Sequence, residues 1–233
     1  MLPVLLSSFD HQTDKNFKLL LINNNSIDKS VAIIKRFRLS SSLQIEIINE
    51  SQQGTGAAVD TGSRYAISKG AKYVARADAD AILEKNWVRA LRRRLNGGYK
   101  LVFGGLHFRK DENTSRLMQV ATKIFFYTAE MLGNLSFDLK NKHRHYIVLG
   151  GNMAFTSDIY ISAGGFPRNS LKDPIKTEDC ILANSIRKLT NKVIRDPDMI
   201  CYYSLRRINR YGLFRSTVWY WLRINILPEV DVR

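Results

Sequence analysis

Two carboxylates stand one residue apart in the segment VARADADAILEKNW, which covers residues 74–87. Asp78 and Asp80 follow an apolar run, although carboxylates are rarely buried unless they are paired or bind a metal ion. Mg²⁺ and Mn²⁺ prefer oxygen ligands and often bind through one or two carboxylates together with substrate phosphates. The spacing therefore indicates a Mn²⁺ or Mg²⁺ site beside a phosphate. A solvated pair that begins a helix, with Asp80 as its cap, is the alternative.

A second acidic pair, Glu178 and Asp179, opens the segment EDCILANSIRKL. Acids in the first turn of a helix interact favourably with the helix dipole. This pair taken alone therefore has a structural explanation, and any chemical role needs support from other segments.

The elements that must position these acids follow from the hydrophobic pattern. Short apolar runs predict strands at residues 17–22, 43–48, 72–77 and 100–105, with helices between them at 30–37, 57–70 and 86–98. In the second half, helices are expected at residues 115–135 and 178–189, and a strand at 146–156. Alternating strands and helices predict an α/β fold with a mostly parallel sheet covered on both faces. Ligands bind beyond the carboxyl ends of such strands, where Asp78 and Asp80 lie.

The composition indicates one globular domain with a strong positive field. The chain has 233 residues and a formal net charge of +15, which attracts nucleic acid, nucleotide phosphates or an anionic membrane surface. Cys180 and Cys201 have no motif spacing and are expected to be reduced thiols of a cytoplasmic protein. No run of about 18 apolar residues is present, so no segment is expected to span a membrane.

Four segments together resemble the inverting glycosyltransferases of family 2, which have the GT-A fold. They are FKLLLINNNSID, GTGAAVDTGSRYAISKGAKYVARADAD, GGNMAFTSDIYISAGGF and TEDCILANSIRK, and they occur in the order found in that family. One such segment is a weak signal, but four in order are specific to the family, though not to a substrate. The resemblance covers residues 2 to about 210 and implies a single domain. Its nucleotide-binding half is 1–105, its acceptor-binding and catalytic half 106–210, and its C-terminal amphipathic segment 211–233.

The resemblance assigns roles to both acidic pairs. Asp78 contacts the ribose or base side of a nucleotide, and Asp80 holds the metal on the diphosphate. Asp179 is the general base that takes the proton from an acceptor hydroxyl, and Glu178 orients the acceptor. The implied donor is a nucleotide-diphosphate sugar, and the implied acceptor is a glycan or a lipid-linked molecule.

Other residues of the matching segments are candidate binding residues. Asn23 and Gly54 are expected near the nucleotide, with a plain turn as the alternative for Gly54. Arg207 and Arg210 resemble the Arg-x-x-Arg motif of processive synthases and could clamp the diphosphate; a chance match in an arginine-rich chain is the alternative. Residues expected to line the acceptor or donor-sugar pocket are Gly150, Gly151 and Asn152. Asp28 is expected to cap a helix, and Asp60 to be a solvated helix residue.

The sequence departs from the family in three places. Asn23 replaces an aspartate that commonly contacts the base, and Val59 replaces a common arginine. The chain also begins at LPVLLSSFDHQ, which resembles the helix after the family's first, central strand. We therefore expect residues 2–9 to be helical and the strands near Leu20 and Val74 to be separated by the place of that strand, or to have closed up. A truncated, weakly active or inactive chain is the corresponding expectation.

Two further interpretations remain open. The net charge and the arginine-rich segment 89–94 suit a nucleic-acid-binding protein, although no known nucleic-acid-binding signature is present. The segment GLFRSTVWYWLRINIL places Trp219, Leu222 and Ile226 at helical spacing. It predicts peripheral attachment to an anionic membrane, on the inner face, with a core helix as the alternative.

Overall fold

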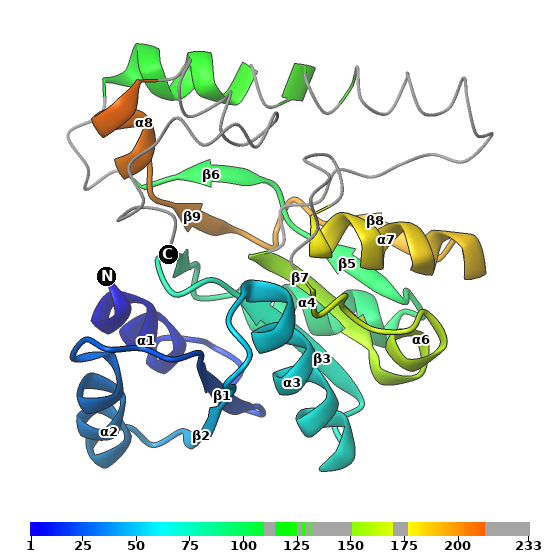
Figure 1. Cartoon of the computed structure of the whole chain (residues 1–233). Helices are drawn as coiled ribbons and strands as arrows, with labels where there is room; N and C mark the ends of the chain where they lie inside the picture. Colours follow the sequence, from blue (N-terminus) through cyan, green and yellow to red (C-terminus); the bar gives the residue numbers. More distant parts are fainter. Residues whose placement is uncertain (110–114, 125–126, 129–130, 132–150, 170–176, 213–233) are drawn as a thin grey trace.

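The computed structural model describes residues 1–109, 115–124, 127–128, 131, 151–169 and 177–212. Figure 1 shows the helices and strands in their spatial arrangement. The helices are α1 (Leu2–Asp10), α2 (Ser30–Ser40), α3 (Thr55–Ser68), α4 (Trp87–Asn96), α6 (Ser157–Ser162), α7 (Glu178–Leu189) and α8 (Arg206–Tyr211). The strands are β1 (Lys18–Asn23), β2 (Gln44–Asn49), β3 (Tyr73–Ala77), β4 (Ile82–Leu83), β5 (Leu101–Phe103), β6 (Leu106–Phe108), β7 (Asn152–Thr156), β8 (Val193–Arg195) and β9 (Cys201–Tyr203). Residues 116–124 are also helical.

The predicted alternation in the first half is confirmed, because each expected strand and helix forms within a few residues of its expected place. Glycines set two of the boundaries. Gly54 precedes α3 with φ of +128°, and Gly70 follows it with φ of +84°, values that L side chains rarely adopt. Asp28 accepts a hydrogen bond from the backbone N–H of Ser30, the first residue of α2, so it satisfies one helix-end donor as expected.

The strands form three separate sheets in the described residues. β1 and β2 pair in parallel, the larger sheet has the order β3-β7-β5-β8, and a third has the order β4-β9-β6. β7 runs antiparallel to both β3 and β5, and β4 antiparallel to β9, while β5–β8 and β6–β9 are parallel. The parallel order predicted for the first half therefore gives way to antiparallel pairing where the second half joins the sheet.

The first helix stands where the sequence predicted it. Residues 2–10 form α1 and not a strand, so they do not supply a ladder partner. Among the described residues, β1 pairs only with β2 and β3 pairs only with β7, so the facing edges of β1 and β3 have not closed onto each other. α3 contacts both strands and thereby joins the small sheet to the large one (Figure 1).

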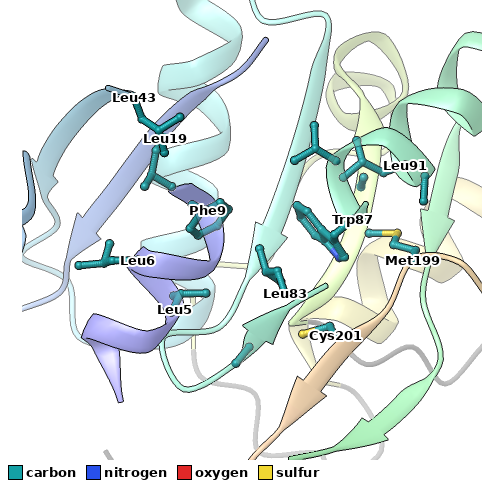
Figure 2. Packing of buried hydrophobic residues seen from close by; sticks show 14 of the residues in the cluster. Leu5, Leu6, Phe9, Leu19, Leu43, Leu83, Trp87, Leu91, Met199 and Cys201 are labelled. Atoms are coloured by element: carbon teal, nitrogen blue, oxygen red, sulfur yellow. The ribbon is translucent and has the colours of Figure 1, made fainter. Parts of the chain in front are cut away.

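The large sheet separates two hydrophobic clusters. The cluster on the α1 and α4 face includes Phe9, Leu19 and Trp87. Figure 2 shows Phe9 of α1 between Leu19 of β1 and Trp87 of α4, and the rings of Phe9 and Trp87 meet edge to face at 6.5 Å. The cluster on the other face includes Phe155 of β7 and Leu182 of α7. β3 and β7 contribute alternate residues to the two clusters, as the strand period of two requires.

Candidate active site

The end of β3 faces α7 because of the strand's alternation. Val74 packs against the cluster that contains α7, so Arg76 and Asp78, two and four residues later, project to the same side. β3 ends at Ala77, and a turn follows in which the N–H of Ala81 donates to the carbonyl of Asp78. The strand therefore places the carboxylate of Asp78 on the side that faces the first turn of α7.

Arg76 contacts both the acid that follows β3 and the first acid of α7. Its Nε donates to Asp78 Oδ1 at 3.2 Å, and its Nη2 donates to Glu178 Oε1 at 3.3 Å. The side chain of Arg76 is only 11% exposed, and nearby carboxylates raise its pKa even though burial acts in the opposite direction. One buried guanidinium thus links the acid that follows β3 to the first acid of α7.

Asp179 is buried in the first turn of α7, with 8% of its surface exposed. Its Oδ1 accepts a hydrogen bond from the N–H of Cys180 at 2.9 Å. Burial raises the pKa of Asp179 above its ordinary value of 3.8, and the negative charge of Glu178 acts in the same direction, whereas the charge of Arg76 opposes both. A carboxylate with a raised pKa is a better proton acceptor than a solvated one.

Asp80 is the third residue of this turn and is half-buried, and its charge acts on Cys201 of β9. Burial raises the pKa of the Cys201 thiol, and the charges of Asp78 and Asp80 raise it further. Both cysteines are buried, and the described residues contain no disulfide between them. The structure thus brings Asp78, Asp80, Glu178 and Asp179 to one end of β3, around Arg76 and Cys201.

The glycine turn before β7 touches the same carboxylates. A Cβ atom at Gly151 would lie 2.4 Å from Oδ2 of Asp78, so only glycine fits there. Gly150 lies outside the described residues. Asn152 was expected in the acceptor pocket, but its side chain is fully buried on the opposite face. Its Oδ1 accepts a hydrogen bond from Trp87 Nε1 at 2.7 Å, and its Nδ2 donates to the Met199 carbonyl at 3.0 Å. The side-chain amide therefore makes its hydrogen bonds within the core.

Replacement of Gly151 by alanine should lower the catalytic efficiency kcat/KM by about 10–100-fold, because a displacement near 1 Å can cost that much. Asp78 cannot simply rotate away, since Arg76 holds its other oxygen. Steady-state kinetics of Gly151→Ala measure the effect. The control is Gly105→Ala, because the nearest atom to a Cβ there lies at 3.5 Å, an ordinary contact. Equal losses in both variants would contradict the close-approach explanation.

The expected nucleotide side is rich in amides. Asn23 Nδ2 donates to Asn49 Oδ1 at 3.0 Å across the ends of β1 and β2. The N–H of Gly54 donates to Asn24 Oδ1, and Asn24 Nδ2 donates to the carbonyls of Glu50 and Gln52. Both expected residues therefore lie in one network at the carboxyl ends of these strands, before α3.

A second ionic network, which the sequence did not reveal, ties this side to the glycine turn after α6. Arg168 donates to Glu50 Oε2 at 2.8 Å, to Thr61 Oγ1 at 2.8 Å and to Asp60 Oδ2 at 3.2 Å. The prediction that Asp60 is solvated was wrong. Asp60 is 1% exposed and also accepts hydrogen bonds from Arg64 and Tyr160, because the turn folds back over α3.

Glu50 should contribute stability that depends on pH. Hydrogen bonds from Thr61, from Arg168 and from the N–H of Gln52 lower the pKa of Glu50 from 4.5 to about 2. A lowered pKa stabilises the fold above the unfolded value, and this contribution is lost as the pH falls from 4.5 through about 2. The difference in unfolding midpoint between wild type and Glu50→Gln should therefore be large at pH 7 and shrink across that window.

Thermal unfolding at several pH values tests this prediction. Glu46→Gln is the matched control, since Glu46 lies on β2, which ends directly before Glu50, and is exposed. A wild-type advantage over Glu50→Gln that stayed constant down to about pH 2 would contradict the role of the Glu50 charge.

The remaining candidates are not joined to the cluster by a described contact. Arg210 of α8 is exposed and lies over the ring of Tyr211 at 5.4 Å, and the side chain of Arg207 lies outside the described residues. The predicted membrane-binding helix also lies outside them. Within the described part of the chain, no helix is long and apolar enough to cross a membrane.

A family profile decides between the interpretations. The profile of Glycosyl transferase family 2 matches residues 1–161, which include β3, Asp78 and Asp80. The chain belongs to glycosyl transferase family 2. Comparison with curated proteins gave no match. The family match ends before α7, so Glu178 and Asp179 rest on the structure and on the resemblance of their segment.

Solved structures of S. aureus TarS share this family's fold. TarS 1–349 is 13% identical over 98% of this chain and 63% of that chain, with a TM-score of 0.61. TarS 1–349 in complex with UDP is 14% identical over the same shares, with a TM-score of 0.60. The complex with UDP-GlcNAc is 12% identical over 87% of this chain and 54% of that chain, with a TM-score of 0.58. The chain thus spans less than two thirds of these TarS chains, and the likeness shows a GT-A fold.

The family motifs predicted the functional aspartates but not the arginines that pair with the buried acids. Arg76 carries a signal of its own, because it is a charge inside an apolar strand and lies two residues before Asp78, hence on the same face. Arg64, four residues after Asp60, similarly indicated an ion pair on one helix face. Arg168 gave no local signal, since its partners lie more than 100 residues away.

Proposed function

We propose that the chain is an inverting glycosyltransferase that moves a sugar from a nucleotide-diphosphate sugar to an acceptor hydroxyl. The observation that supports the proposal is the cluster around Arg76, in which the guanidinium pairs with Asp78 and Glu178 and acts electrostatically on Asp179. Family membership supports sugar transfer, and the cluster supplies groups suited to it.

Asp179 acts as the general base in this proposal. It takes the proton of the acceptor hydroxyl while that oxygen bonds to the anomeric carbon, and the nucleotide diphosphate departs from the opposite face. The sugar carries positive charge in the transition state, as in glycoside hydrolysis. Glu178, which Arg76 holds beside Asp179, orients the acceptor.

A divalent cation fits the carboxylates at the end of β3. Asp80 would hold Mn²⁺ or Mg²⁺, which would neutralise charge on the departing diphosphate. Among the described residues, no group of three or more His, Cys, Asp or Glu side chains is arranged to bind a metal ion. This agrees with an ion that takes most of its ligands from the diphosphate and water, as Mg²⁺ usually does.

Structures with a similar fold suggest which donors to test first. TarS has been crystallised with UDP and with UDP-GlcNAc, which makes UDP-sugars the first donors to test here. The acceptor is proposed to be a glycan or a lipid-linked molecule. Peripheral contact with an anionic membrane, through residues 211–233, belongs to the same proposal.

Nucleic-acid binding loses its main structural support. In α4, Arg92 pairs with Asp14, and Arg93 and Arg94 both pair with the fully buried Asp196. These three arginines are therefore paired with acids of the same chain. The positive field remains suited to a nucleotide diphosphate.

A panel of nucleotide sugars, with and without Mn²⁺, tests the proposal. The true donor should raise the unfolding midpoint, since a ligand at 100 times its Kd adds about 2.7 kcal/mol, and should be hydrolysed or transferred on longer incubation. Salt-sensitive binding to random oligonucleotides, with no effect of any nucleotide sugar, would favour the nucleic-acid alternative.

A further inference from the structure

Arg76 occupies a place where a charge is costly. It lies on the face of β3 that otherwise packs into the cluster of Met153, Phe155 and Phe166, and its guanidinium lies 5.8 Å from the ring of Phe166. A buried charge destabilises the fold unless it is paired and hydrogen-bonded. A residue that only filled this position would be apolar, like Val74 on the same face.

The pairing of Arg76 is also incomplete. Nε and Nη2 reach Asp78 and Glu178, but within the described structure the buried Nη1 has no hydrogen-bond partner. An unmade buried hydrogen bond costs about 1–3 kcal/mol. Such a cost is typical of groups held in place for chemistry.

The two partners of Arg76 belong to different halves of the reaction. Asp78 follows β3 on the nucleotide side, and Glu178 begins α7 directly before the proposed base. Asp78 and Glu178 are 100 residues apart in the chain. Arg76 contacts both of them and therefore directly links the proposed donor side to the proposed acceptor side.

We propose that Arg76 is a positioning residue, whose guanidinium fixes Asp78 and Glu178 relative to each other and thereby holds Asp179 in line with the bound sugar. This inference rests on the proposed function. It predicts a defect in turnover more than in donor binding, because the donor can still bind when the base is misplaced. A misplacement near 1 Å costs about 100-fold in rate.

Three variants separate the effect of the hydrogen bonds that Arg76 makes to both carboxylates from the effect of its positive charge. Arg76→Gln removes the charge and both ionic contacts. It should lower kcat by about 10–100-fold, with KM for the donor within about threefold of wild type. Arg76→Lys keeps the charge, but an ammonium is a single point that cannot bridge two carboxylates in the way a planar guanidinium does. It should therefore recover only part of kcat. Arg92→Gln, which breaks the pair with Asp14 on the other side of the molecule, is the matched control and should keep wild-type kcat.

The pH profile adds a readout that a purely structural role would not move. Of the described charged groups, Arg76 and Glu178 act on Asp179, and Asp78 acts on Arg76. The charge of Arg76 lowers the pKa of Asp179 against the effect of burial. The acid limb of kcat should therefore shift to higher pH in Arg76→Gln and return toward the wild-type position in Arg76→Lys.

A double-mutant cycle tests the bridge without activity. Arg76→Gln, Glu178→Gln and the double variant are compared by denaturant unfolding, and the two replacements should be coupled by about tenfold in the unfolding equilibrium. Additive effects, or an unchanged kcat in a folded Arg76→Gln, would overturn the proposal. A wild type that turns over no nucleotide sugar would instead refute the proposed function, and the cycle would still decide whether Arg76 holds Glu178.

Discussion

Replacement of Asp179 by asparagine should lower kcat for sugar transfer by about 10²–10⁴-fold, the usual contribution of a general base. The amide has nearly the same shape but cannot accept the acceptor's proton. Asp179 makes no described contact with Asn23 or Gly54, the residues predicted to lie near the nucleotide, so donor binding should stay close to that of the wild type. Initial rates and thermal stabilisation by the donor measure the two properties separately.

The pH dependence of the wild type checks the same assignment. Because burial raises the pKa of Asp179 above 3.8, activity should be lost as the pH falls through this raised value, at a higher pH than for a solvated aspartate. Asp158→Asn is the matched control, since Asp158 also lies in a first helical turn but is exposed and pairs with Lys100. An Asp179→Asn variant that lost donor binding as fully as turnover would contradict a role on the acceptor side.

Replacement of Asp80 by asparagine should abolish the dependence of donor binding on Mn²⁺ or Mg²⁺. A neutral amide oxygen is a much weaker ligand for a hard cation than a carboxylate. Loss of an outer-sphere partner already weakens metal sites by about 10–100-fold, so loss of the direct ligand should exceed that range. Donor binding measured by calorimetry across a Mn²⁺ titration gives the effect.

Asp198→Asn is the control for the loss of one negative charge, because Asp198 is exposed and pairs with Arg93 on another part of the surface. Metal-dependent donor binding that persisted in Asp80→Asn would remove Asp80 as the ligand. The Asp179→Asn variant should retain the metal dependence of donor binding. The two variants should therefore differ, with Asp179→Asn impaired in turnover and Asp80→Asn impaired in metal-dependent donor binding.

The sequence predicted those parts of the fold that depend on local patterns. The apolar runs of β1, β2 and β3 and the glycines around α3 carry their own signals, as does the acidic start of α7. The family and its fold were also correctly predicted, because four segments occur in a characteristic order.

The predictions that were wrong concern features that depend on long-range packing. The glycine-containing segment predicted that Asn152 lines a pocket, but its side-chain amide accepts a hydrogen bond in the core from Trp87, which is 65 residues away. Asp60 was predicted to be solvated, but the turn at Gly165 places Tyr160 and Arg168 in contact with its carboxylate. The antiparallel direction of β7 likewise has no local signature, since it depends on where the second half of the chain re-enters the sheet.

Within the described residues, β1 and β3 each have one edge with no strand partner, and these edges have a consequence for the behaviour of the protein in solution. An open strand edge is a template for strands of other molecules, and β1 is apolar over Leu19, Leu20, Leu21 and Ile22. The net charge of +15 makes copies of the chain repel one another and opposes such pairing. Salt screens this repulsion, since the Debye length falls from about 10 Å at 0.1 M to about 3 Å at 1 M. Colloidal stability should therefore decline as ionic strength rises, and low-salt buffers should favour the monomer.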